Sequence, residues 1–202
     1  MTAEEAKDAC HYVFVYGTLK SGENFNHFLA RPTDGRASLV GPARTVKKWP
    51  LVLASSHEIP CILHYEGLGH EVYGEVYKVD DRMLELLDRL ESHPDFYVRS
   101  LEDVVVLSRH QSGNSEDQAT PHSAKTSSKP PSNHSELPLR LNVWVYFMRK
   151  NEKELLTLPH LSNYTLKPGI VWPELTADKE ETQRFLVSEF QNVHKNDSGS
   201  NS

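Results

Sequence analysis

VFVYGTLKSG, residues 13–22, is the stretch of this sequence on which the interpretation of the fold depends. Its first residues are β-branched and aromatic, which favours a strand, and the run stops at Gly17. Glycine there permits a positive φ or a close backbone approach, and Gly22 would give a second bend. Successive amides in such a turn can form a concave nest for an anion or a carbonyl oxygen. The stretch therefore indicates either a plain strand end or a backbone cradle at the mouth of a sheet.

Composition limits the class of protein. The chain has 202 residues, 38% of them hydrophobic, which suits one domain with appendages. The formal net charge is −6 and the Lys and Arg residues are scattered, so we expect no nucleic acid and no membrane as a partner. No apolar run approaches the roughly 20 residues of a membrane span, and the first residues lack the apolar segment of a secretory signal. Cys10 and Cys61 form no C-x-x-C pattern, which suits the reducing cytoplasm, and we expect a cytoplasmic protein.

The chain divides into one domain and a tail. The segment His110–Glu136 has seven serines, three prolines and only two alanines as apolar residues, a composition typical of disorder. It lies between two strand-like runs, Tyr97–Leu107 and Leu139–Met148, so it reads as an expanded hairpin loop. We expect a single domain over residues 1–175 that contains this insertion at about 110–136. A C-terminal helix and a polar tail would follow over residues 176–202.

Strands dominate the rest of the chain. Further β-rich runs cover Tyr12–Tyr16, Trp49–Ala54, Ile59–Tyr65 and Glu71–Val79. One helix is clear, with Asp80 as its N-cap. Because there is no regular βαβ alternation, the pattern favours an α+β fold with a curved sheet or small barrel over a doubly wound fold.

An acidic residue interrupts the apolar face of that helix. On a wheel of about 100° per residue, the apolar residues occupy one arc, namely Met83, Leu84, Leu86, Leu87 and Leu90. Glu91 falls inside the same arc, at the end of the helix. Burial and the negative end of the helix dipole would both raise its pKa toward the range useful for general acid/base catalysis. The alternative is a side chain frayed past the helix end, or one that caps a neighbouring backbone group.

These motifs together resemble a known family. The order of the stretches resembles the γ-glutamyl cyclotransferase-like family, and within it the γ-glutamylamine cyclotransferase branch; the stretches are VYGTLKSG, GEVYKVD, LESHPDFY and WPLVLASSHEIP. The resemblance covers about Tyr12–Leu107 and Arg140–Tyr164. It implies a compact mixed β-barrel with few helices. It also implies a lyase that closes a γ-glutamyl amine, such as γ-glutamyl-ε-lysine, into 5-oxoproline and a free amine.

The resemblance also implies the roles of individual residues. Carried over to this sequence, the turn Tyr16, Gly17, Thr18 and Leu19 would hold the glutamyl head of the substrate. Glu91 would be the catalytic acid/base. No metal, nucleotide or other cofactor is then expected, because nucleophile and electrophile belong to one molecule.

Three features leave the substrate open. Family members usually have an asparagine three residues after the second glycine, whereas here Asn24 and Asn26 lie two and four residues after Gly22. Cys61 stands where the branch tends to have a bulky aromatic residue, which would widen the channel for the leaving amine. The serine-rich insertion is unusually long for the family. Alternatives are a γ-glutamyl-amino-acid or glutathione cyclotransferase, or a non-catalytic ligand-binding module of the same fold, and protein partners are not evident from the sequence.

Other residues suggest rival sites less strongly. The eleven histidines show no metal-ligand spacing, and no G-x-S-x-G elbow marks a serine hydrolase. Glu75 is a second candidate carboxylate, which either points outward or orients the substrate or Glu91. Trp49, Tyr97 and Tyr146 are interpreted as core aromatics.

Overall fold

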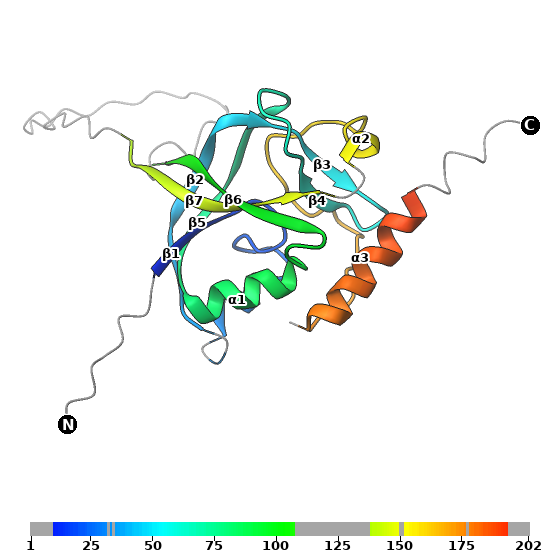
Figure 1. The fold of residues 1–202 in the computed structure, drawn as a ribbon, viewed down its shortest axis with the longest axis horizontal. Helices are drawn as coiled ribbons and strands as arrows, with labels where there is room; N and C mark the ends of the chain where they lie inside the picture. Colours follow the sequence, from blue (N-terminus) through cyan, green and yellow to red (C-terminus); the bar gives the residue numbers. More distant parts are fainter. Residues whose placement is uncertain are drawn as a thin grey trace, which may run out of the picture.

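A closed barrel of five strands forms the centre of the computed structural model, which describes residues 10–31, 33, 35–107, 138–149, 152–176 and 178–193 (Figure 1). The strands follow one another around the barrel in the order β1, β5, β2, β6 and β7; their bounds are Cys10–Val15, His70–Asp80, Ala37–Trp49, Tyr97–Val106 and Arg140–Met148. Four of the five pairings are antiparallel, and a parallel pairing of β1 with β7, at Val13 and Trp144, closes the barrel. The expected mixed β-barrel is confirmed.

Smaller elements cover the barrel. A hairpin of β3, Leu51–Ala54, and β4, Ile59–Ile62, joins β7 through a bridge just after its second strand. The helical segments are η1, α1, α2 and α3, with the bounds Asn26–Ala30, Asp81–Leu90, Glu152–Leu155 and Lys179–Val193. In Figure 1, α1 crosses one end of the barrel, and α3 begins near α1 and runs toward the β3–β4 hairpin. None of the described helices is long and apolar enough to cross a bilayer.

The longest strand, β2, was not expected from the sequence. The sequence predicted one strand over Trp49–Ala54, whereas the chain has β2 ending at Trp49 and β3 starting after Pro50. Gly41 and Pro42 interrupt the β-rich pattern inside β2, and the strand register shifts there. Charged residues at its far end also hide the alternation, because buried and more exposed residues alternate only over the middle of this strand.

The β6–β7 hairpin agrees with its prediction. Its two strands pair in continuous register from Tyr97 opposite Met148 to Val105 opposite Arg140. A hydrogen bond of 2.8 Å from Val106 N to Leu139 O holds the ends of the strands together. The predicted insertion between them lies outside the described residues, and the division into a domain and a tail stays a prediction.

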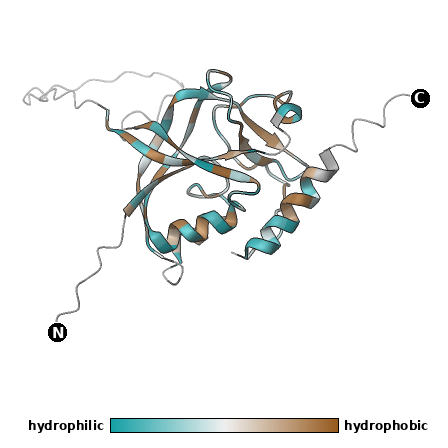
Figure 2. Ribbon diagram, viewed as in Figure 1, coloured by the Kyte–Doolittle hydropathy of each residue, from teal (hydrophilic) through white to brown (hydrophobic). Residues whose placement is uncertain are grey.

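Helix α1 is amphipathic and begins as expected. The Asp80 carboxylate accepts a hydrogen bond of 2.9 Å from Met83 N, which caps the first turn. The four leucine and methionine residues at 83, 84, 86 and 87 are buried, and Leu90 packs against them at the edge of the core. Figure 2 shows the apolar residues of α1 alternating with polar ones along the helix. The buried face of α1 therefore packs toward the barrel, and Glu91, the residue after Leu90, is directed toward the barrel as well.

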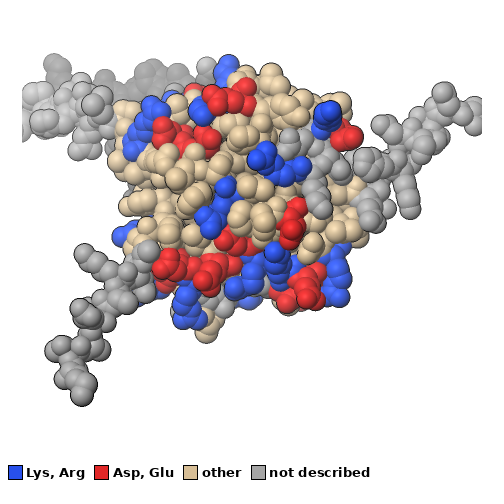
Figure 3. Space-filling model, viewed as in Figure 1, with Lys and Arg blue, Asp and Glu red and all other residues tan. Residues whose placement is uncertain are grey.

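Charges are intermixed on the face that Figure 3 shows. Acidic and basic side chains lie next to one another there. Within the described residues, several such side chains form ion pairs, for example Arg140 with Asp103 and Lys179 with Asp95. That face carries no extended basic surface of the kind that nucleic acids require.

Candidate active site

A cavity of about 70 Å³ opens where several segments of the chain meet. These are β1 with the turn after it, the start of β4, the end of α1, the chain from Trp172 into α3, and one residue each from β6 and β7. Most of the lining is apolar. Its polar members are Tyr16, Thr18, Glu91, Tyr97, Tyr146 and Thr182.

The turn after β1 presents unpaired backbone donors. Each carbonyl oxygen of residues 17–19 accepts a hydrogen bond of 2.9 or 3.0 Å; the donors are Lys20 N, Phe25 N and Asn26 Nδ2. By contrast, the three amide groups of residues 17–19 donate to no partner within the described residues. Since all three residues line the cavity, the turn leaves its positive dipole ends for a bound group.

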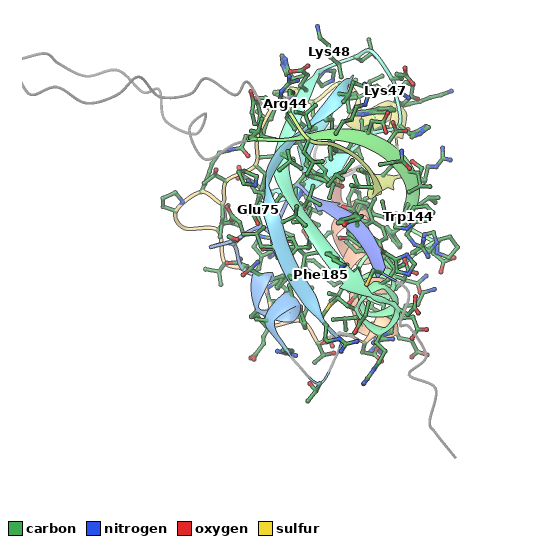
Figure 4. All side chains as sticks on the ribbon, turned by 90° about the vertical axis from the view of Figure 1, so that its left-hand side faces the viewer. Arg44, Lys47, Lys48, Glu75, Trp144 and Phe185 are labelled. Atoms are coloured by element: carbon green, nitrogen blue, oxygen red, sulfur yellow. The ribbon has the colours of Figure 1, made fainter. Side chains whose placement is uncertain are left out.

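Side chains from β5 hold this turn from behind. One oxygen of the Glu75 carboxylate accepts hydrogen bonds from Ser21 N at 2.9 Å, Ser21 Oγ at 3.0 Å and the Tyr77 hydroxyl at 3.1 Å. Asn26 donates to the same Tyr77 hydroxyl at 3.1 Å as well as to the turn. Glu75 lies on β5 (Figure 4) and is not among the residues that line the cavity, so this carboxylate supports the turn and has no contact with Glu91.

These contacts show which of the two asparagines after Gly22 reaches the turn. Asn26, four residues after Gly22, is the one whose side chain reaches the turn, through its bond to Leu19 O. Asn24 is exposed and contacts His27 only through its backbone carbonyl.

Gly17 is required for space, while Gly22 is required for its conformation. A Cβ atom on Gly17 would lie 2.5 Å from Pro60 Cγ, so only glycine lets the turn pack against β4. Gly17 does not have a positive φ, so the first of the two reasons given for it was wrong and the second, close approach, applies. Gly22 has a φ of 83°, which gives the expected second bend.

Glu91 ends α1 and lines the cavity. It is the C-cap residue, and its backbone amide still donates to Leu87 O at 2.9 Å, so the side chain keeps the direction that the helix gives it. The residue is half-buried, and within the described chain its carboxylate has no hydrogen-bond or ion-pair partner. It is therefore neither frayed into solvent nor used as a backbone cap.

The surroundings raise the pKa of Glu91 from 4.5 to about 8. Burial is the larger cause, because it disfavours the charged form, and the negative charge of Asp88 adds to it. Asp88 is itself fixed: Arg99 Nε and the Tyr146 hydroxyl donate to its Oδ1 at 2.8 and 2.7 Å. Glu91 is thus a carboxyl group that can both take up and release a proton near neutral pH.

The tyrosines around the site are structural as well as exposed to the cavity. The Tyr16 hydroxyl donates to Tyr146 O at 2.8 Å, and the Tyr97 hydroxyl donates to Pro60 O at 3.3 Å. Tyr97 and Tyr146 are buried, as a core assignment requires, yet both also line the cavity. Burial raises the pKa of Tyr16, Tyr97 and Tyr146, so these hydroxyls stay neutral.

The residues expected from the sequence lie around the same cavity. The cavity is lined by all five of them, although four follow β1 and the fifth follows α1 in the sequence; they are Tyr16, Gly17, Thr18, Leu19 and Glu91. Their assignment to substrate binding and catalysis stays a prediction. Cys61 is different: it is fully buried, its sulfur lies 3.3 Å from the Tyr97 hydroxyl, and it is not part of the lining. The sequence had suggested that Cys61 widens the channel, but the residue does not line the cavity and so does not widen it directly.

Several lining residues were not anticipated. They come from the turn toward η1 and from the C-terminal part of the chain; they are Phe25, Trp172, Leu175, Thr182, Phe185 and Leu186. The only sequence signal was the apolar spacing of Phe185, Leu186 and Phe190, which predicted a helix without indicating its neighbour. Among the described residues, no group of three or more His, Cys, Asp or Glu side chains is placed to hold a metal ion.

Comparisons with known proteins point to one family. Residues 13–166 match the family model described as gamma-glutamyl cyclotransferase, AIG2-like. A gamma-glutamylaminecyclotransferase from Homo sapiens is 37% identical over 75% of this chain and 88% of its own length. The one from Bos taurus is 51% identical, but the match covers 44% of this chain and spans only 52% of the relative. The crystal structure of an AIG2-like protein from Mus musculus superposes with a TM-score of 0.61 at 31% identity, covering 77% of this chain and 88% of that one.

Proposed function

The chain belongs to the gamma-glutamyl cyclotransferase, AIG2-like family, and from that premise we propose that it is a γ-glutamylamine cyclotransferase. Such an enzyme is a lyase that converts a γ-glutamyl amine, for example γ-glutamyl-ε-lysine, to 5-oxoproline and a free amine. The reaction is an intramolecular acyl transfer in which the substrate's α-amino group displaces the amine from its own γ-carbonyl.

One observation carries the proposal. The Glu91 carboxylate has no partner among the described residues. It lines the same cavity as residues 17–19, whose three backbone amides donate no hydrogen bond within the described residues. Both groups are costly to leave unsatisfied away from water, so their pairing with a ligand offsets that cost. A cyclisation needs one base of suitable pKa and donors for a developing oxyanion, and these two groups supply them.

The proton and the electrons follow a short path in this scheme. The neutral α-amine attacks the γ-carbonyl carbon, and Glu91 takes one of its two protons while the other stays on the ring nitrogen. The carbonyl oxygen becomes an oxyanion, which hydrogen-bond donors of the turn stabilise. The C–N bond to the amine then breaks, and Glu91 returns the proton to the departing nitrogen.

Positioning supplies most of the remaining rate. The nucleophile and the electrophile lie in one molecule, so ring closure requires only that the glutamyl head be held bent. The backbone of Tyr16, Gly17, Thr18 and Leu19 holds that head, and the Glu75–Ser21–Tyr77 contacts keep this backbone rigid. No step calls for a metal or a covalent enzyme intermediate.

The proposed compartment is the cytoplasm. Neither Cys10 nor Cys61 forms a disulfide within the described residues, which suits a reducing environment. The small-molecule substrate is the only partner that the reaction needs.

The test is direct. Purified protein is incubated separately with γ-glutamyl-ε-lysine, γ-glutamyl-alanine and glutathione, and released 5-oxoproline is quantified. Release from the first substrate, well above the other two, is the expected result. Release chiefly from γ-glutamyl-alanine or glutathione would make the protein a γ-glutamyl-amino-acid or glutathione cyclotransferase, and release from none would leave a binding module.

A further inference from the structure

Trp172 lines the cavity but follows the part of the chain that the family model matches. The match ends at residue 166, and Trp172 lies in the irregular stretch before α3. Its indole Nε1 is buried and has no hydrogen-bond partner within the described residues. An indole N–H group can only donate a hydrogen bond. It can therefore be satisfied only by an acceptor that the described part of the chain does not supply.

Other polar groups around the cavity are already in use. Four hydroxyl groups of the lining each donate to a protein oxygen at 2.7–3.3 Å; they belong to Tyr16, Tyr97, Tyr146 and Thr182. The proposed function uses the amides of residues 17–19 for the glutamyl head. Trp172 Nε1 is thus a buried side-chain donor that remains for the other half of the substrate. A donor left unpaired away from water costs free energy, which a ligand with an acceptor offsets.

Aromatic rings hold the indole of Trp172 in place. Its ring centre lies 5.3 Å from that of Phe25 and 5.8 Å from that of Phe185. The His57 ring lies 6.2 Å away, and His57 is itself fixed by the buried Glu189 carboxylate, 2.8 Å from its Nδ1. Phe25 and Phe185 are half-buried and line the cavity. A substrate group that enters there therefore contacts these two rings and, once a ring shifts, the indole N–H.

The leaving half of γ-glutamyl-ε-lysine carries one group that can accept this hydrogen bond. Its α-carboxylate is an acceptor, whereas its methylene chain and its α-ammonium group are not. A hydrogen bond to a carboxylate is charge-assisted and roughly twice as strong as a neutral one. The ammonium group suits the same surroundings, because cations are attracted to the faces of aromatic rings and most strongly to that of tryptophan. The lysine end therefore finds partners for both of its charges beside Trp172.

We propose that Trp172 is a specificity-determining residue of the cyclotransferase, and that its indole N–H donates to the α-carboxylate of the departing lysine. This rests on the proposed function and names the contact by which the site recognises the leaving amine. The carboxylate lies away from the bonds that react, so the contact stabilises the bound substrate and the transition state alike. Its loss should therefore raise KM and leave kcat nearly unchanged.

Two substrates that differ by one group test the proposal. γ-Glutamyl-cadaverine keeps the methylene chain and the terminal ammonium group of γ-glutamyl-ε-lysine and lacks only its α-carboxylate. We expect kcat/KM for the lysine compound to exceed that for the cadaverine compound by about tenfold or more, the scale of a hydrogen bond to a charged group. Trp172→Phe keeps an aromatic ring but removes the N–H group. It should raise KM for the lysine compound by about tenfold and change the kinetics of the cadaverine compound little.

Trp49→Phe is the matched control. Trp49 Nε1 is likewise buried and without a partner in the described part of the chain, but Trp49 lies outside the cavity lining. Trp144→Phe is a second control, because Trp144 lies on β7 and is also outside the lining. Both variants should keep the preference for the lysine compound, and thermal unfolding establishes that each variant is folded.

A spectroscopic measurement covers the case in which Trp172→Phe does not fold. The chain has three tryptophans, so ¹⁵N-labelled protein should give three indole N–H signals, and the two control variants assign all three by elimination. In the Glu91→Gln background, which should bind substrate without converting it, saturating γ-glutamyl-ε-lysine should move the Trp172 signal downfield. Saturating γ-glutamyl-cadaverine should not.

The outcomes separate the two proposals. Equal kcat/KM for the two substrates, an equal loss for both in folded Trp172→Phe, or the same indole shift with both ligands overturns the role of Trp172 and leaves the cyclotransferase in place. No 5-oxoproline from either substrate overturns the cyclotransferase, and the role of Trp172 with it.

Discussion

Glu91→Gln separates the chemical use of this side chain from its effect on stability. Glutamine keeps the shape of glutamate but cannot accept a proton. If Glu91 is the acid/base, turnover should fall by about two decades or more, the scale usual for such a group. The same change should make the protein more stable, because it removes a carboxylate that the fold keeps in its neutral form.

The size of the stability gain follows from the pKa. Folding raises the pKa of Glu91 from 4.5 to about 8, so the folded state binds a proton that the unfolded state releases over this interval. Stability associated with this carboxyl is therefore full below pH 4.5 and falls as the pH rises toward 8. By linkage, the loss is about 1 kcal/mol at pH 5 and at most about 3 kcal/mol at pH 7. Glutamine avoids both losses, so its advantage over glutamate should grow by about 2 kcal/mol between these two pH values.

Chemical denaturation at pH 5 and pH 7 measures this difference. The matched control is Glu85→Gln, which changes an exposed residue of the same helix and should alter stability little at either pH. A glutamine variant at position 91 whose advantage is the same at both pH values would refute the reasoning about burial. Retained turnover in that variant would falsify the catalytic role.

Three other changes test the remaining parts of the site. The mechanism needs both the Glu91 carboxylate and the neutral α-amine of the substrate, so kcat/KM of the unaltered protein should rise by more than tenfold per pH unit below about pH 7 and begin to level off above about pH 8. Asp88→Asn removes the charge that helps to raise the pKa of Glu91, so the part of the profile that belongs to Glu91 should move to lower pH, and an unmoved profile argues against this charge effect. Gly17→Ala places a Cβ atom 2.5 Å from Pro60 Cγ, and we expect a loss of about 1–3 kcal/mol in stability together with a raised KM, which denaturation and initial-rate kinetics would detect. Glu75→Gln weakens the support of the turn, so KM should rise several-fold with kcat changed less; a fall in kcat as large as that of the Glu91 variant would mean that Glu75 takes part in the chemistry.

The barrel could be predicted from the sequence where strands are uniform in composition. Tyr97–Val106 and Arg140–Met148 are both rich in β-branched and aromatic residues, so their long separation in the chain did not hide their pairing. β2 was missed because Gly41 and Pro42 lie inside it and because much of its surface is exposed. A period-two pattern is visible only when one face is buried throughout.

The position of Glu91 could be predicted from the sequence for a local reason. Glu91 lies a few residues from the leucines whose spacing defines the buried face of α1, so a helical wheel already placed it toward the core. The support of the turn by Glu75 was not readable, because it depends on the pairing of β1 with β5 and on the path of residues 18–26.

The cavity lining from residues 172–186 was the part of the site that the sequence predicted least well. Phe185 and Leu186 gave a helical apolar face, but a helix face does not state what it covers. Trp172 lies in an irregular stretch without any periodic pattern, and its contact with Phe25 joins residues far apart in the chain. Such contacts are fixed by tertiary packing alone.

Strand β5 passes into helix α1 without a connecting residue, since Asp80 ends one and Asp81 begins the other. Glu75, which braces the turn, and Glu91 therefore belong to a single rigid arm, and Asp80 also binds Arg36 N at 2.9 Å to anchor the middle of it. The cavity lining from residues 172–186 is built on a separate piece of chain. Substitutions in that segment could accordingly reshape the cavity while Glu75 and Glu91 stay on their common support.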